Sequence, residues 1–219
     1  VSNKEGNNME TGIITTLIKK STLTGKIKAD FITLEVDESY VPIVFKKIPL
    51  DTLIVLNFFR DQLDRNGEVE SLILKINEFL KDYKGNLVLN ADDPNVSRLA
   101  NANKENNKIY YFSVEKYKYA SKEQKEAGEG KFCPFDKARL EYEYYQYSHI
   151  GKFKCPVCGY GDVKPYTKIK NVNLEGMSFD EGKEHYITKA NNIYTIYNFA
   201  AVIACLNLYN IESKEALQT

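Results

Sequence analysis

Two short clusters in this chain carry side chains that bind metals. Cys155 and Cys158 form a CxxC pair followed by glycine, in CPVCG at 155–159. An earlier CPFD at 133–136 supplies Cys133, but Asp136 stands where a second cysteine would complete the pair. Two thiolates on one tight turn are half of the tetrahedral ligand set of Zn²⁺. The spacing therefore predicts a zinc site formed by Cys133, Asp136, Cys155 and Cys158, in which water or His149 could replace Asp136.

A second set of chemically able residues follows the predicted strands. In open parallel sheets, ligands bind at the carboxyl ends of the strands. Each of three predicted strands ends here in polar side chains, which makes this edge a candidate active site. The residues are Glu35, Asp37 and Glu38 after the first strand, Asn57, Arg60 and Asp61 after the second, and Asn90, Asp92 and Asp93 after the third.

The elements that must position these residues alternate between helix and strand. Apolar spacing predicts helices at 13–21, 68–83 and 192–211, and buried strands at 29–38, 52–59 and 86–90. Residues 166–190 could supply further strands. Repeated alternation of this kind favours a three-layer α/β fold with a mostly parallel sheet.

The cysteine clusters interrupt this pattern. A charged segment at 115–131 is typical of a linker, and 139–155 alternates aromatic and polar residues around a predicted turn at 149–151. We interpret 1–128 and 167–219 as two parts of one α/β domain, with 129–166 inserted between them as a zinc-ribbon-like β-hairpin module. So small a module has little core of its own, so its zinc would be structural.

Composition narrows the function classes. The chain has 30 basic and 30 acidic residues among 219, so it has no overall charge to attract nucleic acid, and we expect no nucleic-acid partner. It contains no apolar run of membrane-spanning length. Its four cysteines fit metal binding in a reducing compartment better than a disulfide framework. We therefore expect a cytoplasmic protein.

Five motifs occur along the chain in a fixed order. They are SNKEGNNMETG at 2–12, LEVDE at 34–38, NFFRDQLDRNGE at 57–68, LNADDP at 89–94 and IYNFAAVIA at 196–204. Together they resemble the central, ATP-binding domain of the Mur ligase superfamily. Gln62, where most of these ligases have histidine, and the cysteine insert resemble the amidating branch, the ligase subunits of lipid II isoglutaminyl synthases.

The resemblance implies an ATP-dependent carbon–nitrogen ligase of peptidoglycan synthesis. A carboxylate would be activated as an acyl phosphate and then attacked by ammonia, which a GatD-like class I glutaminase subunit would deliver. The product would be the D-isoglutamine form of the lipid II stem peptide. Membrane contact would then arise only through the lipid substrate.

The resemblance also assigns residues by motif position. Glu35 would hold Mg²⁺, a hard cation that prefers carboxylate oxygen. Asn198 matches an asparagine that reaches adenine, although its usual partner is Thr195 here. Asn90, Asp92 and Asp93 would border the nucleotide pocket. The loop near the phosphates and the acceptor would contain Arg60, Asp61, Gln62 and Asp64.

The chain has no GxxxxGK[ST] phosphate loop. We therefore expect a fragment that by itself binds ATP weakly or not at all and does not catalyse the ligase reaction.

Two alternatives remain open at this point. An amino-acid-adding Mur ligase or a folylpolyglutamate-synthase-like ligase would share the α/β pattern but lack the cysteine insert. A zinc-ribbon module that binds nucleic acid or protein would instead show salt-sensitive retention of single-stranded DNA.

Overall fold

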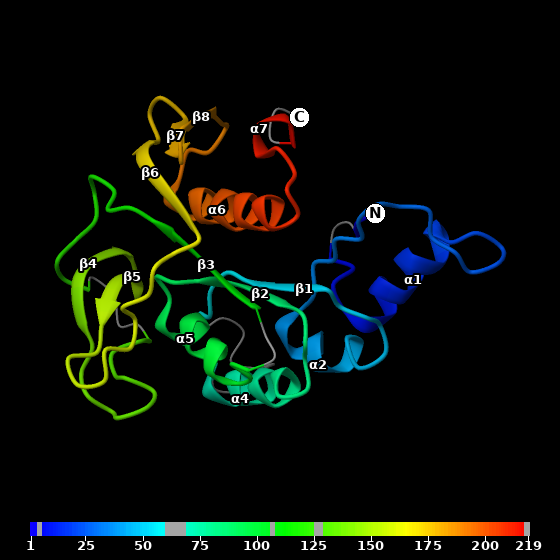
Figure 1. Ribbon diagram of the computed structural model, residues 1–219, viewed down its shortest axis with the longest axis horizontal. Coiled ribbons are helices and arrows are strands. Elements are labelled where there is room, and N and C mark those ends of the chain that lie inside the picture. Colours follow the sequence, from blue (N-terminus) through cyan, green and yellow to red (C-terminus); the bar gives the residue numbers. More distant parts are fainter. Residues whose placement is uncertain (4–5, 60–68, 106–107, 125–128, 217–219) are drawn as a thin grey trace. The chain divides into compact units, whose positions relative to one another are not determined.

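The computed structural model describes residues 1–3, 6–59, 69–105, 108–124 and 129–216 (Figure 1). The chain divides into two compact units. The first is formed by the described residues of Val1–Leu50 and Gln62–Phe79, and the second by those of Asp51–Asp61 and Leu80–Thr219. In chain order the elements are α1 (Glu10–Lys20), η1 (Glu38–Tyr40), α2 (Val41–Val44), β1 (Thr52–Val55), α4 (Val69–Leu80), β2 (Asn86–Asn90), α5 (Pro94–Ser97), η2 (Arg98–Asn101), β3 (Lys108–Val114), β4 (Glu141–Tyr147), β5 (Ile150–Lys154), β6 (Thr167–Asn173), β7 (Ser178–Glu181), β8 (Glu184–Ile187), α6 (Ile193–Leu208) and α7 (Ser213–Ala216).

The first unit corrects one expectation. Residues 29–38 form no strand, and most of their side chains are exposed rather than buried. This extended segment pairs with the start of the chain: Thr33 N donates to Val1 O at 2.8 Å, and Asn3 Oδ1 accepts from Glu35 N at 2.9 Å. The prediction of a buried strand at 29–38 is therefore wrong, because this extended segment pairs with the start of the chain and stays largely exposed.

The mostly parallel sheet of the second unit is confirmed. Its six strands have the order β1-β2-β3-β6-β7-β8, in which the first four run parallel and the last two are antiparallel. β2 is buried on both faces through Leu87, Val88 and Leu89, as expected for a central parallel strand. β1 and β2 pair in register from Thr52 with Asn86 to Val55 with Leu89, so their polar ends reach the same edge.

The long C-terminal helix, α6, covers one face of this sheet (Figure 1). Asn192 caps it, because its Oδ1 accepts from Thr195 N at 2.8 Å. Ala200, Ala201 and Ala204 are fully buried, and their small side chains allow close approach to the strands. This helix was predicted; β3 was not, although Ile109, Val114 and three aromatic residues between them favour a strand.

The predicted hairpin is also present. β4 and β5 form a two-stranded antiparallel sheet outside the six-stranded one, with Tyr147 paired to Ile150 across a turn of Ser148 and His149 (Figure 1). Ser148 has a left-handed φ of 43°, which the tight turn requires. A small separate core lies beneath the hairpin and includes Phe153 and Leu140. Residues 129–166, which contain this hairpin and both cysteine clusters, are called the cysteine module below.

Candidate functional site

Two loops of the cysteine module share one backbone design. In the first loop, Cys133 N donates to Ala138 O at 2.8 Å, and Lys137 N donates to Cys133 O at 3.1 Å. In the second, Cys155 N donates to Tyr160 O at 2.7 Å, and Gly159 N donates to Cys155 O at 3.0 Å. Both loops thus use the same two hydrogen bonds at the same spacing.

The shared design places Asp136 where the second loop has Cys158. Each of these residues is the third after a buried cysteine and is followed by a residue in the left-handed region, Lys137 at φ 65° and Gly159 at φ 74°. The first loop is therefore a cysteine turn with a carboxylate substituted at its last ligand position.

The four side chains converge on one point. Their ligand atoms, from Cys133, Asp136, Cys155 and Cys158, all lie within 4.8 Å of one another. Cys133 Sγ is 3.6 Å from Cys158 Sγ, and Cys155 Sγ is 3.3 Å from Asp136 Oδ2. Tetrahedral zinc with Zn–S bonds of about 2.3 Å separates sulfur atoms by about 3.8 Å, so this cluster has the size of a zinc site. Among the described residues, His149 is not part of this cluster.

Charge in the cluster is unbalanced in a way that a cation would relieve. The Asp136 carboxylate accepts hydrogen bonds from the Cys158 thiol, which has the largest effect, and from the Ala138 amide. These hydrogen bonds lower the pKa of Asp136 to about 2. The same carboxylate raises the pKa of Cys158 to about 12, because a thiolate beside it would be a second negative charge. A divalent metal ion between them would allow the thiol to ionise and bind.

The acidic residues after β2 are buried and already bound. Asp92 Oδ2 accepts from Val114 N at 3.0 Å and from the Tyr197 hydroxyl at 2.7 Å. Burial raises the pKa of Asp92 to about 6, although these hydrogen bonds and Lys152 act in the opposite direction. Tyr197 was not singled out from the sequence, since its place in an apolar helix gave no sign of a polar role.

Asp93 connects three segments at the same edge. Its Oδ1 accepts from Asn95 N at 2.7 Å and Val96 N at 3.3 Å, which caps α5. Its Oδ2 accepts from Phe58 N at 2.9 Å, in the segment that follows β1. Asn90 acts similarly, because its side chain donates to Leu56 O at 2.9 Å. The structure therefore brings Asn90, Asp92 and Asp93 together as buried supports of the carboxyl edge.

The remaining predicted residues are placed separately. Glu35 lies in the first unit with an exposed carboxylate, whose Oε1 is 3.5 Å from Asn8 Nδ2. Asn198 is exposed on α6 in the second unit. Arg60, Asp61, Gln62 and Asp64 lie outside the described residues.

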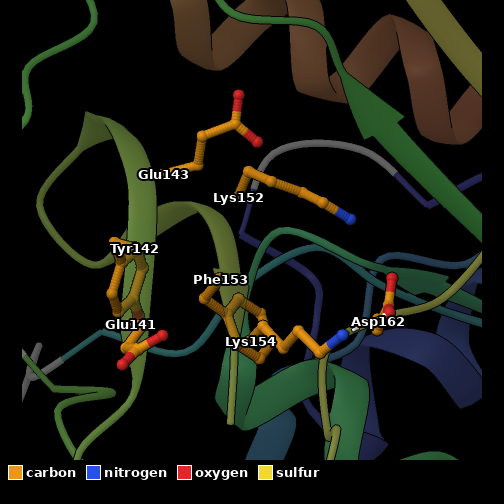
Figure 2. Close-up of a pocket in the computed structure, with 7 residues that line it drawn as sticks. All are labelled: Glu141, Tyr142, Glu143, Lys152, Phe153, Lys154 and Asp162. Carbon is orange, nitrogen blue, oxygen red and sulfur yellow. Dashed lines mark hydrogen bonds and ion pairs between the residues drawn. The ribbon is translucent and has the colours of Figure 1, made fainter. Parts of the chain in front are cut away.

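A hollow of about 320 Å³ on the hairpin has a different character (Figure 2). Glu141, Glu143 and Asp162 line it together with Lys152 and Lys154, over Tyr142 and Phe153. Lys154 Nζ is 2.8 Å from Asp162 Oδ2, an ion pair drawn in Figure 2. Three carboxylates beside two lysines would repel phosphate, so this hollow does not have the charge of a nucleotide site.

Two solved structures share the fold of this chain. A pseudomurein peptide ligase type C from Methanothermus fervidus superposes on 85% of this chain and 38% of its own, with a TM-score of 0.68 and 24% identity. MurF from Acinetobacter baumannii superposes on the whole chain and 39% of its own, with a TM-score of 0.62 and 11% identity. The fold is that of part of a Mur-type ligase. No family model matches the chain.

Within that class, the chain resembles MurT subunits of lipid II isoglutaminyl synthase (glutamine-hydrolyzing). The relative from Staphylococcus aureus strain COL is 32% identical over 207 residues, or 94% of this chain and 45% of its own. The relative from Streptococcus pneumoniae strain ATCC BAA-255 / R6 is 29% identical over 220 residues, 98% of this chain and 47% of its own. The chain thus spans less than half the length of these curated relatives, and the resemblance seen in its motifs is confirmed.

Proposed function

We propose that this chain is the middle part of an ATP-dependent ligase subunit that amidates the D-glutamate of the lipid II stem peptide. The observation that carries the proposal is the 32% identity to MurT subunits over 94% of the chain. The parallel sheet with its polar carboxyl edge supports it, because phosphoryl transfer depends on groups positioned at such an edge. A GatD-like class I glutaminase subunit would supply ammonia.

The proposed reaction has two steps. The substrate carboxylate attacks the γ-phosphorus of ATP, which forms an acyl phosphate and releases ADP. Ammonia then attacks the acyl carbon, phosphate leaves with the bonding electrons, and the nitrogen loses a proton to give the amide. Negative charge develops on phosphoryl oxygens in the first step, so the site must supply positive charge there.

Different residues of this chain have different roles in the proposed reaction. The exposed carboxylate of Glu35 would bind Mg²⁺ through oxygen, and Mg²⁺ would neutralise phosphate charge. Asn90, Asp92 and Asp93 border the nucleotide pocket, where their buried side chains hold its backbone in place. Asn198, exposed on α6, reaches adenine. The loop with Arg60, Asp61, Gln62 and Asp64 serves the phosphates and the acceptor.

We further propose that residues 129–166 form an inserted zinc-ribbon-like module between two parts of the ligase domain, 1–128 and 167–219. The four converging ligand atoms support this proposal. The zinc would be structural, because the buried core of the module holds little more than Leu140 and Phe153 beside two of the cysteines.

Among the described residues no helix is both long enough and apolar enough to cross a membrane. The proposed ATP-dependent chemistry and the four free cysteines fit the cytoplasm.

The test is reconstitution of the full-length subunit that contains this sequence, together with a class I glutaminase. We expect lipid II to be amidated at its D-glutamate only when ATP, glutamine and both subunits are present, as read by mass spectrometry of the stem peptide. Free ammonia at high concentration should replace glutamine and the partner. Addition of an amino acid in place of ammonia, with no amide formed, would contradict the proposal.

A further inference from the structure

The cysteine module is attached to the carboxyl end of β2 at three consecutive residues. Gly151 N donates to Asp92 O at 2.9 Å, at the start of β5. The Tyr160 hydroxyl donates to Pro94 O from the second cysteine loop. Between these two contacts, His149 Nε2 lies 3.5 Å from Asp93 Oδ2. The module therefore reaches the same edge that Asp92 and Asp93 hold together.

His149 is the most unusual of these contacts. Its side chain is 1% exposed, and neither ring nitrogen has a hydrogen-bond partner among the described residues. A buried, unsatisfied polar group is costly, so its position needs a reason. Its ring lies against Phe59, with centroids 4.9 Å apart, and the Asp93 oxygen that it approaches also accepts from Phe58 N. The hairpin tip thus meets the segment after β1 at one carboxylate oxygen.

The tip is mechanically linked to the cysteine cluster. Cys155 follows directly on β5, whose first residue, Ile150, is next to His149. The Tyr142 hydroxyl lies 2.9 Å from Gly130 O and 3.1 Å from His149 O. The same side chain thus contacts both the start of the module, at Gly130, and the hairpin tip, at His149. Gly130 itself packs on Pro94, because a Cβ there would be 2.6 Å from Pro94 Cγ.

We infer that metal in the cysteine cluster positions the carboxyl edge of β2, with His149 as the positioning residue at the contact. Metal binding orders the two loops, β5 transmits that order to His149, and His149 with Gly151 and Tyr160 holds residues 92–94. The meaning of this edge as a nucleotide wall rests on the proposed function. The coupling itself does not, because it can be measured without turnover.

Amide hydrogen exchange by NMR of the zinc-loaded and chelated chain tests the coupling. We expect chelation to accelerate exchange about tenfold or more at the amides that bond to this edge, while the central amides of β2 keep their protection. The test amides are those of Phe58, Asn95, Val96, Val114 and Gly151, and the reference amides those of Leu87, Val88 and Leu89. Unchanged test amides, or equal acceleration at both sets, would overturn the inference.

Histidine NMR supplies a second readout, at the contact itself. The chain has two histidines, His149 at the tip and His185 in β8, so each gives separate side-chain signals. Chelation should change the ¹⁵N signals of His149 and leave those of His185 in place. Unchanged His149 signals would overturn its positioning role.

A variant arm breaks the contact without touching a metal ligand. Gly130→Ala places a methyl group against Pro94, whereas Gly182→Ala has a similar left-handed φ, 59° against 71°, and open space around its Cβ. We expect the Phe58, Asn95 and Val96 amides to exchange faster in Gly130→Ala at unchanged zinc content, and normally in Gly182→Ala. Identical behaviour of the two variants would contradict the coupling. Absence of zinc from the native chain would also overturn the inference, because the inference requires a metal in the cluster.

Discussion

The carboxyl edge of β2 and the cysteine cluster both contain aspartates, but these aspartates have different partners. At the edge, Asp92 and Asp93 are buried and accept hydrogen bonds from backbone amides and Tyr197. In the cluster, Asp136 is exposed, lies beside three thiols and accepts a hydrogen bond from one backbone amide, that of Ala138. The edge is complete without a ligand, whereas the cluster leaves charge that a metal would satisfy.

This difference distinguishes carboxylates that support the backbone from carboxylates that can bind a ligand. A carboxylate with several amide donors holds the backbone and has little capacity left for a ligand. A carboxylate that lies beside three thiols has the donor set of a possible metal site. The following substitutions test the distinction in order of decreasing effect.

Removal of a buried ligand should have the largest effect. Cys155→Ser should abolish stoichiometric zinc and unfold the cysteine module, because zinc ligation supplies about 10 kcal/mol or more in small zinc domains. Zinc competition with a chromophoric chelator measures the loss. Cys205→Ser is the control, since Cys205 lies in α6 away from the cluster, and it should keep full zinc. Equal zinc in both variants would contradict a metal role for the cluster.

At the edge, Asp93→Ala should lower the free energy of unfolding by about 4 kcal/mol. Three amides, those of Phe58, Asn95 and Val96, lose their acceptor in a buried place, at about 1 to 1.5 kcal/mol each. Urea unfolding measures the change. Asp162→Ala removes an exposed ion pair with Lys154, which solvent screens, and should change the free energy of unfolding very little. A loss of similar size in both variants would show that Asp93 is not the support described above.

Asp92 should make stability depend on pH. Its pKa is raised to about 6 in the folded chain, so the folded state binds more protons than the unfolded state between about pH 4 and 6. Unfolding free energy should therefore fall as pH rises through this window, by about 3 kcal/mol at 1.36 kcal/mol per pKa unit. Asp92→Asn should remove this slope, because it does not titrate. Parallel pH profiles for variant and wild type would count against the raised pKa.

Comparison of the two cysteine loops gives the smallest prediction. Lys137 adopts the left-handed conformation that Gly159 adopts in the second loop, and this costs a residue with a side chain about 1 kcal/mol or more. Lys137→Gly should relieve it and stabilise the chain by about 0.5 kcal/mol after the entropy of glycine is counted. Thermal unfolding measures the gain. A lower melting temperature would mean that Lys137 makes a contact of greater value than the strain.

The sequence predicted what local pattern determines. Cysteine spacing identified the four converging residues, and apolar periodicity predicted α1, α4 and α6. It failed where distant partners decide: residues 29–38 pair with the start of the chain instead of entering the sheet. Burial of Asp92 could not be foreseen either, because it depends on Tyr197 and Gly151, far along the chain.

Elemental analysis of zinc per chain, repeated on Asp136→Ala, tests the metal site most directly. The cluster geometry predicts stoichiometric zinc in the native chain and a clear loss in Asp136→Ala, because the substitution removes one of four ligands. Stoichiometric zinc that survives the substitution would remove Asp136 from the ligand set. A native chain that contains no zinc after purification without chelators would contradict the metal site itself.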